Sequence, residues 1–506
     1  MLEIKQESKR ITDNKPENFM KKKALSLFSV VLIVLFSYAM SWGSGFGITS
    51  IGFKATGMGG AFRGVVDDWS ASFWNPAGLA SMDYSEVSAS FSVLSPRPSY
   101  EPNISFEGFE VGYKNGIKWY PDDKNLEVPN FGGFVKIGKW GGFTTGMSFF
   151  IPYSAKYDWD LYQPPPGYET GTPYPRKNHQ IDLEVLDFHP SIARELVEDK
   201  LSAGLGLSVM FANFLYRRTI LVPTDPQLEI ERPYENFPLD AKLDEDGWGF
   251  GFNLGILYKL TPKIQLGISY RSPIDLGLSG KTTLDLYSPD NPWLRDLLIY
   301  KYPGTGIERY IRGKLFSQEL DEEVDLSLPG DFGVGIAFMP HERITLAFDV
   351  NRVNWSRLEK INPRFLVDKI GIVGDSIISP EMLLESAEKC DVLFNWDDVT
   401  RISFGFAFLP LENLPVCGGF YFDPSPISDN TLSPILPEIE DKSGITLGIG
   451  YDFGDLGIGY NYEYQSYKER DVMDLNDSNQ DGIFDNYPGS YWMDAHISHF
   501  AISYRF

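Results

Sequence analysis

The sequence predicts an all-β protein, a transmembrane antiparallel β-barrel of about 14 strands. Two observations lead to this prediction. Many short segments alternate between apolar and small or polar residues, and the connections between these segments are short and long in turn. The composition agrees, because 36 Phe, 27 Tyr and 48 Gly in a chain of 506 residues suit strands with aromatic faces joined by tight turns.

Residues 343–351 show the alternation most clearly. Every second residue of this segment is apolar and falls on one face of an extended chain, and the others are small or polar. The apolar face consists of Ile344, Leu346, Phe348 and Val350. Residues 248–260, 401–409 and 456–465 repeat the pattern. Alternation alone fits a soluble sandwich as well as a barrel whose apolar face meets lipid.

The lengths of the connections favour the barrel. The short ones are TPK, HER, LEN and GD, at residues 261–263, 341–343, 411–413 and 454–455. The long ones cover roughly residues 213–247, 281–324, 357–398, 425–442 and 467–492. Short periplasmic turns and long extracellular loops are typical of outer-membrane barrels, whereas a sandwich does not sort its loops so strictly.

The predicted strands are 84–95, 131–140, 142–154, 181–197, 201–213, 247–260, 263–281, 325–340, 343–356, 398–410, 414–424, 442–453, 455–467 and 493–506. Their even number puts both ends of the barrel on the short-turn side. The last segment, HFAISYRF, places Phe500, Ile502, Tyr504 and the terminal Phe506 on one face, which resembles the outer-membrane assembly signal.

Residues 1–43 are interpreted as an N-terminal extension and a signal peptide. Lys21, Lys22 and Lys23 precede the apolar run at residues 24–40, and small residues follow it, as in secretory signals. A membrane anchor helix is the alternative. Met20 is the expected true start, because the charged residues before it add nothing that a signal peptide needs. We therefore expect the protein in the outer membrane of a Gram-negative-type bacterium.

The charge and the cysteines limit the partners. The formal net charge is −24, so nucleic acid is excluded as a partner, since phosphate binding needs clustered Lys and Arg. Two cysteines, Cys390 and Cys417, allow one disulfide but not a disulfide framework. No Ser, Cys or His stands in a convincing catalytic context, so we expect no enzyme and no catalytic residues.

The chain resembles the FadL/TodX (OMPP1) family of outer-membrane transporters of long-chain fatty acids and other hydrophobic compounds. The likeness is carried by GFGITSIGFKATGMGGAFRGVVDDWSASFWNPAGLA at residues 45–80, by hairpins at 247–280 and 326–357, by the Ser-Pro loop at 419–438 and by the last strand. It implies a barrel over residues 84–506, plugged by an N-terminal hatch at residues 44–83. Asn75, Pro76 and Ala77 form the hatch motif, in which we expect the Asn75 amide to satisfy backbone groups. Asp67 and Asp68 are expected to hold polar groups of the wall.

The resemblance also implies a function. We expect passive uptake of long-chain fatty acids or other hydrophobic compounds, with lateral release into the membrane, by a barrel that contacts outer-membrane lipid and lipopolysaccharide and is a monomer. The substrate-binding candidates are Phe46, Ile48, Ile51 and Phe53. Gly146 is the candidate for a kink that opens the wall, and a small lumen-facing residue is the alternative. Protein secretion or surface attachment is the alternative function.

Two loops carry further hypotheses. Asp477, Asn479, Asp481 and Asp485 surround Gly482 in the pattern of the first part of a calcium loop, but Pro488 stands where the twelfth-position Glu is expected. The loop at 477–485 therefore binds Ca²⁺ or is an acidic, solvated loop, and no other cofactor is expected. Residues 291–311, which mix apolar residues such as Trp293, Leu294 and Leu297 with charged ones, form either an outer apolar groove or a hairpin that packs on a neighbouring loop.

Overall fold

The computed structural model describes residues 45–106, 109–110, 112–122, 125–137, 142–163, 174–222, 237–288, 299–300, 303–304, 313–365, 391–478 and 483–506. The predicted signal peptide and the start at Met20 lie outside the described residues.

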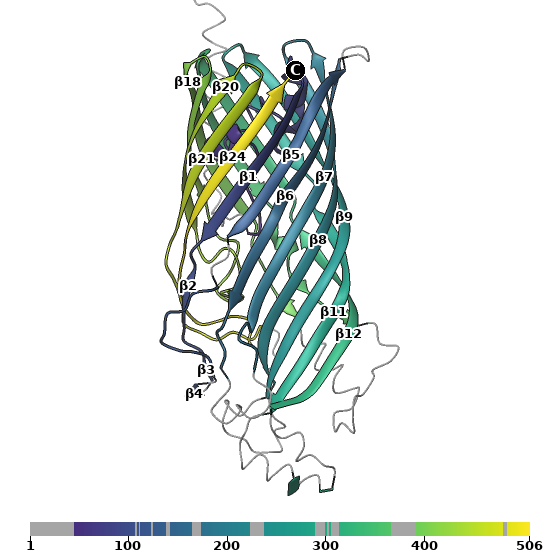
Figure 1. Ribbon diagram of the computed structural model, residues 1–506, viewed down its shortest axis with the longest axis vertical. Coiled ribbons are helices and arrows are strands. Elements are labelled where there is room, and N and C mark those ends of the chain that lie inside the picture. The colour runs from purple at the N-terminus through teal and green to yellow at the C-terminus, as the bar shows by residue number, and fades with distance from the viewer. Residues whose placement is uncertain are drawn as a thin grey trace, which may run out of the picture. The chain divides into compact units, whose positions relative to one another are not determined.

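A closed antiparallel barrel forms the body of the described chain (Figure 1). Its wall consists of β1 (Glu86–Pro96), β5 (Leu126–Ile137), β6 (Phe143–Trp159), β7 (His179–Val197), β8 (Leu201–Val222), β9 (Phe237–Thr261), β10 (Ile264–Arg271) continued by β11 (Ile274–Ser288), β12 (Gly313–Leu328) continued by β13 (Asp331–His341), β14 (Ile344–Val353), β18 (Val399–Leu411), β19 (Leu414–Asp423), β20 (Lys442–Phe453), β21 (Leu456–Tyr467) and β24 (Asp494–Arg505). With each broken strand counted once, these described segments make a 14-strand wall, which confirms the predicted fold.

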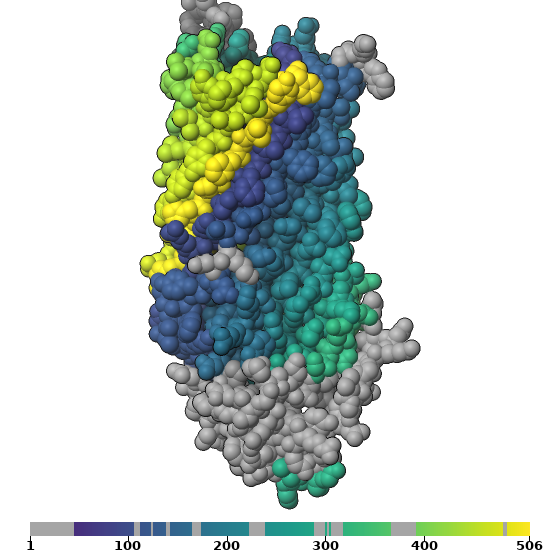
Figure 2. Space-filling view, viewed as in Figure 1, coloured from purple at the N-terminus to yellow at the C-terminus, as the bar shows by residue number. Residues whose placement is uncertain are grey.

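The barrel closes where the first strand meets the last. β1 pairs with β24 from Glu86, opposite Arg505, to Pro96, opposite Ala495. Figure 2 shows the two strands side by side on the surface, β1 in purple and β24 in yellow. The start of β1 and the end of β24 therefore lie at the same end of the barrel, the end of the short turns, as the sequence predicts.

The wall is apolar outside and small or polar inside. Large side chains such as Phe250, Ile445 and Leu447 are exposed, whereas Ser92, Asn253 and Asn461 are almost completely buried. This is the reverse of a soluble protein and fits a barrel whose outer face meets lipid. It confirms the alternation predicted from the sequence.

Several strands extend further toward the long-loop end than the sequence predicts. β8 continues to Val222 rather than ending near 213, and β9 begins at Phe237 rather than near 247. In this extension the outward residues of β9 are Lys242, Asp244 and Asp246. Charged residues replace the apolar outer face there, so the segment lacks the pattern by which a lipid-facing strand is recognised.

Short elements complete the described structure. Three small helices, α2 (Phe53–Gly57), α3 (Ala71–Trp74) and the 3-10 helix η1 (Pro76–Ser81), belong to the hatch. The loop elements are β2 (Ser99–Pro102), β22 (Arg470–Val472) and β23 (Gly489–Trp492) in one sheet, β3 (Ser105–Phe106) with β4 (Phe109–Glu110), β15 (Lys360–Ile361) with β17 (Val392–Leu393), β16 (Arg364–Phe365) beside β12, and the 3-10 helix η6 (Trp355–Arg357). Within the described ranges, no helix has both the length and the apolar character needed to cross a bilayer.

Candidate functional site

The hatch lies inside the barrel, and the side chain of Asn75 joins it to the wall by hydrogen bonds. The Asn75 side chain is fully buried and donates from Nδ2 to the carbonyl oxygens of Arg63, at 3.0 Å, and of Ile256 on β9, at 3.1 Å. Its Oδ1 accepts from the Ala77 backbone N–H at 3.2 Å. One amide thus bonds to two backbone groups of the hatch and to one of the wall, and it joins two parts of the hatch to β9.

Charged wall residues fasten the other side of the hatch. Asp349 on β14 accepts from the backbone N–H groups of Phe62, at 3.0 Å, and Arg63, at 2.8 Å. Arg271 on β10 donates to the Phe73 carbonyl at 2.9 Å, and its guanidinium lies 3.8 Å from the centre of the Phe73 ring. These contacts hold backbone groups of the hatch that its short helices leave without partners.

Glycines in the wall make room for this contact. A Cβ atom on Gly267 would lie 1.8 Å from the Arg63 carbonyl oxygen, and one on Gly255 would lie 2.1 Å from Asn75 Oδ1. Any larger residue at these positions must push the hatch away from the wall.

The two acidic residues of the hatch differ from the prediction. In the described structure Asp67 pairs with Lys54 and Asp68 accepts from Ser70, so both bind within the hatch and not to the wall.

Strands β5 and β6 separate partway along the wall. Their ladder runs from Ile137 opposite Phe143 to Phe131 opposite Phe149 and does not continue in the described segments beyond that pair. Residues 126–130 pair with β1 alone, and β6 continues with β7 after a register shift between Phe150 and Tyr153. Pro129 and Pro152 lie at this point, and neither has an N–H to donate to a ladder.

The first described residues close the gap between these strands. The Ile48 N–H donates to the Pro152 carbonyl at 2.8 Å, and the Ser154 N–H donates to the Phe46 carbonyl at 3.0 Å. The Ile48 side chain packs with Val128 of β5 and Ile151 of β6. We call residues 45–51 the N-terminal segment; it replaces β5 as the partner of β6 and fills the opening with an apolar side chain.

The Phe46 side chain occupies an aromatic cage. Its ring centre lies 4.9 Å from that of Trp396, 6.1 Å from Trp355 and 6.4 Å from Phe394, and only 1% of the residue is exposed. Trp355 begins η6, and the other two rings belong to residues 391–398, which precede β18. Edge-to-face and tilted contacts at these distances are favourable for aromatic rings.

The four predicted substrate-binding residues do not form one pocket. Phe46 and Ile48 lie at the cage and the gap, as described above, whereas Ile51 is completely buried in the core of the hatch. Phe53 lines a wider cavity of about 450 Å³ at the short-turn end. Burial and the two neighbouring carboxylates, Glu86 and Asp67, raise the pKa of Asp68, which lines the same cavity, to about 7.

Two small cavities flank the N-terminal segment. One, of about 60 Å³, is lined by Phe46 and Ile48 together with residues of β1, β5, β6 and β24 and the loop before β20. The other, of about 70 Å³, lies between residues 47–49, the hatch and charged wall residues. Each has room for water but not for a long-chain compound, so a ligand must displace the N-terminal segment to bind there.

Gly146, the predicted gate residue, lies in unbroken ladders. It pairs with Phe134 on β5 and with Ser191 on β7, and a Cβ atom there would lie 2.6 Å from Ser191 Oγ and 3.3 Å from Leu79 of the hatch. Its position is that of a small residue facing the lumen. The separation of the strands lies further along β6, at Ile151 and Pro152.

The remaining hypotheses fall mostly outside the described residues. Asn479 and Asp481 of the calcium hypothesis are among them, and Asp485 accepts from the Ser478 N–H at 2.7 Å, so Ca²⁺ binding stays a prediction. Most of residues 291–311 and Cys390 also lie outside the described ranges. Cys417 is a buried free thiol on β19.

The cage residues were not predicted from the sequence. Trp355 stands in the Asn-Trp-Ser stretch that ends a hairpin, but nothing local in the sequence indicates contact with Phe46. Phe394 and Trp396 lie about forty residues away in a long loop. The signal for the gap was present, because Pro129 and Pro152 interrupt segments that otherwise read as central strands.

A closed barrel with an apolar outer face, a plug fastened in its lumen and a break in its wall defines an outer-membrane transport channel. A family model described as outer membrane protein transport protein (OMPP1/FadL/TodX) matches residues 34–506. The chain belongs to this family, whose members are transporters of fatty acids and other hydrophobic compounds in the outer membrane of Gram-negative bacteria.

Known relatives and structures agree. The chain is 23% identical to the long-chain fatty acid transport protein of Escherichia coli O6:H1 over 85% of this chain and 89% of the relative. It is 19% identical to outer membrane protein P1 of Haemophilus influenzae over 90% and 93% of the two chains. Its fold is similar to that of a Pseudomonas aeruginosa FadL homologue (TM-score 0.68, 17% identity, 91% and 99% covered) and of the Pseudomonas putida toluene transporter TodX (0.61, 16%, 92% and 99%).

Proposed function

We propose that the protein takes up a hydrophobic compound passively and releases it sideways between β5 and β6 into the outer membrane. The observation that carries this proposal is the double role of the N-terminal segment. Phe46 fills the aromatic cage, and two residues later Ile48 fills the gap in the wall. A ligand that displaces Phe46 from the cage therefore also removes the cover of the gap, which leads to lipid.

The chemistry of the path suits an apolar compound. Once the N-terminal segment has moved, the cage offers three aromatic rings and the gap the side chains of Val128 and Ile151, all of which gain from contact with apolar surface. Contact with apolar surface favours the binding of such a compound. Its passage from the lumen into the membrane therefore needs no energy source. The Escherichia coli relative is a long-chain fatty acid transport protein and TodX is a toluene transporter, so long-chain fatty acids and aromatic hydrocarbons are the two candidate substrate classes.

A reversible lock on the N-terminal segment tests the proposal. Gly47 faces Tyr153 in an antiparallel bridge flanked by the two hydrogen bonds described above, a pair whose Cα atoms lie close enough for a disulfide. The variant Gly47→Cys/Tyr153→Cys is expressed in cells that lack their own transporter. Uptake of labelled oleate and toluene is measured before and after reduction.

We expect the oxidised double variant to lose uptake and the reduced one to match the two single variants. Ser88→Cys/Ser503→Cys, which joins two continuously paired strands away from the gap, serves as the control lock. Unchanged uptake in the oxidised Gly47/Tyr153 variant, with the disulfide demonstrated, contradicts release past this segment.

Protein secretion or surface attachment is the second candidate function. The small volumes beside the N-terminal segment, about 60 and 70 Å³, support it, because a lumen filled by its plug suits an interaction role. Absence of uptake for every hydrophobic compound, with the barrel correctly inserted, favours this alternative. Cross-linking of intact cells then identifies the protein partner.

A further inference from the structure

The cavity of about 60 Å³ beside the N-terminal segment has an apolar body and a charged end. Its apolar lining includes Leu94, Leu126, Tyr157, Tyr467, Met493 and Ile497. The charged end consists of Glu438, in the loop between β19 and β20, and Lys442, the first residue of β20. A ligand in this cavity therefore meets these two side chains with whatever polar group it carries.

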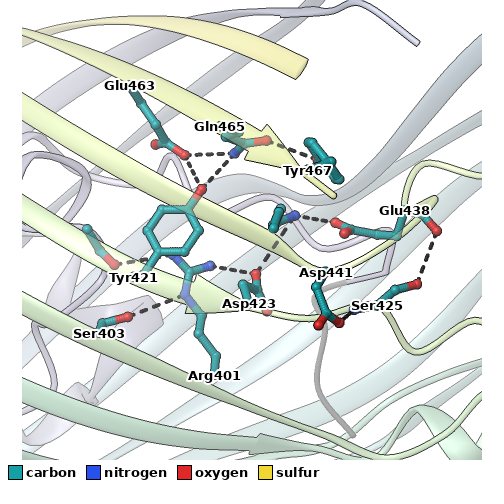
Figure 3. A network of polar contacts seen from close by, with 12 residues as sticks. Arg401, Ser403, Tyr421, Asp423, Ser425, Glu438, Asp441, Glu463, Gln465 and Tyr467 are labelled. Atoms are coloured by element: carbon teal, nitrogen blue, oxygen red, sulfur yellow. Dashed lines mark hydrogen bonds and ion pairs between the residues drawn. The ribbon is translucent and has the colours of Figure 1, made fainter. Parts of the chain in front are cut away.

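The cations at this end already have carboxylate partners (Figure 3). Lys442 forms an ion pair with Glu438, and its Nζ lies 3.8 Å from Asp423 Oδ2. Arg401 Nη1 lies 3.3 Å from the same Asp423 oxygen, and its Nη2 donates to the Gly59 carbonyl at 3.2 Å. All four charged side chains are at least nine-tenths buried. When Glu438 is ionised, the two buried cations face three buried carboxylates, because Glu463 is also buried beside the cavity. A ligand carboxylate would therefore add an uncompensated negative charge in a low-dielectric site.

The neutral donors beside the cavity are also engaged. Gln465 donates from Nε2 to Glu463 Oε1, at 2.7 Å, and to the Tyr421 hydroxyl, at 2.9 Å. The Tyr467 hydroxyl donates to Gln465 Oε1 at 3.1 Å. Ser50 Oγ, which lines the cavity, has no partner among the described residues, but a hydroxyl accepts and donates equally and so does not discriminate.

One acceptor remains open. Glu438 Oε1 contacts Lys442, whereas Oε2 is buried without a hydrogen-bond partner in the described structure. An unsatisfied buried carboxylate oxygen is costly, and water in the cavity is its natural partner when no ligand is present. A ligand hydroxyl reproduces the bond that this water makes, and a carboxylate cannot.

We propose that Glu438, in its ionised form, is a specificity-determining residue that selects apolar compounds with a neutral hydroxyl head group over compounds with an ionised carboxylate. This inference rests on the proposed uptake function. It names a long-chain alcohol or a phenol, rather than an ionised fatty acid, as the ligand class that the charged end of the cavity fits.

The test compares three sixteen-carbon compounds that differ only at one end: hexadecane, hexadecan-1-ol and palmitate. Their binding to the purified protein in lipid nanodiscs is measured at pH 9, with empty nanodiscs as the background. We expect the wild-type protein to bind the alcohol about tenfold more tightly than palmitate, because the carboxylate must enter beside a built-in negative charge. Glu438→Gln should raise palmitate affinity and reduce the difference to about twofold.

Glu440→Gln is the matched control, since it carries the same change two residues along the loop and does not line the cavity. It should keep the wild-type preference. Tighter binding of palmitate than of hexadecanol by the wild-type protein overturns the proposal and needs no variant. An unchanged preference in folded Glu438→Gln also overturns it. Binding of none of the three compounds above background overturns the uptake of long-chain compounds, on which this inference rests, and so separates the two failures.

Discussion

The two parts of the plug are held in the lumen by different forces. Residues 52–83 are fastened by hydrogen bonds from buried side chains, among them those of Asn75 and Asp349, and by close contact with wall glycines. The first half of the N-terminal segment is held to β6 by two backbone hydrogen bonds and by the apolar and aromatic packing of Phe46 and Ile48. In the described structure, side-chain hydrogen bonds reach only its last two residues, where Asn130 donates to the Ser50 carbonyl at 3.4 Å and Trp74 to the Ile51 carbonyl at 3.0 Å. An apolar ligand competes directly with such packing but not with buried polar bonds. We therefore expect the N-terminal segment to move during transport and the rest of the hatch to stay in place.

The largest effect is expected from crowding the fixed part. Gly267→Ala places a Cβ atom 1.8 Å from the Arg63 carbonyl oxygen, so the hatch has to move off the wall. We expect cells with this variant to become sensitive to large antibiotics, because the lumen opens. Gly277→Ala is the control, since a Cβ atom there meets nothing within 4 Å. Equal resistance of the two variants at equal expression contradicts a tightly fitted hatch.

Removing the Asn75 amide should come next. Asn75→Ala leaves the Arg63 and Ile256 carbonyls and the Ala77 N–H without their partner, and we expect a loss of about 3 kcal/mol in the stability of the hatch. Hydrogen exchange of residues 52–83 measures it. Asn413→Ala, in the short turn after β18, serves as the control. Faster exchange confined to residues 45–51 argues against the fixed role of Asn75.

Phe46→Ala addresses the movable part. Loss of the ring from the cage should speed hydrogen exchange at residues 45–51, while the thermal unfolding of the barrel changes little, because the three rings of the cage belong to segments outside the strand ladders. Phe46→Leu, which keeps an apolar side chain, should have a smaller effect. If hydrogen exchange becomes faster over the whole hatch as well as at residues 45–51, the two parts move together.

The smallest effect concerns pH. Burial raises the pKa of the Glu438 carboxyl to about 8, against the opposing charges of Lys442 and Arg401 and with support from Asp423. The group is therefore ionised at pH 9 and mostly neutral at pH 6. Hexadecyl sulfonate stays anionic over this range, so its binding should rise severalfold as the pH falls.

The matched measurement uses Glu438→Gln, in which the rise should be absent. Tyr157 and Tyr467 line the same cavity, but a buried tyrosine hydroxyl keeps its proton throughout the range of the measurement. A rise of the same size in Glu438→Gln assigns the pH dependence to another group.

The barrel was predictable because its pattern is local. The 343–351 strand shows its two faces within nine residues, and the turns at 261–263 and 411–413 mark where the chain reverses. The outer halves of β8 and β9 were missed, since charged residues replace their lipid-facing side there. The breaks at Pro273 and at Pro329, where β10 passes into β11 and β12 into β13, were also read as continuous strands.

The site was predictable only in part, because its members come from distant segments. Phe46 was singled out by resemblance, but its cage consists of Trp355, Phe394 and Trp396, which meet only when β14 and β18 pair. No sequence motif singled out Glu438 as a site residue. The position of the gap could have been predicted, since Pro129 and Pro152 indicate where a ladder must end. Gly146 was chosen because a glycine in a strand can mark a kink, which is a weaker indication.

The position of the hatch also bears on how the molecule is assembled. Its partners are spread around the ring: Ile256 on β9, Asp349 on β14, Thr446 on β20 and Asn461 on β21. The same segment leads directly into β1, the strand that closes the seam with β24. A segment made before any strand thus touches strands from most of the wall, and it offers each of them a fixed register. We therefore expect variants that loosen the hatch to lower the yield of closed barrels.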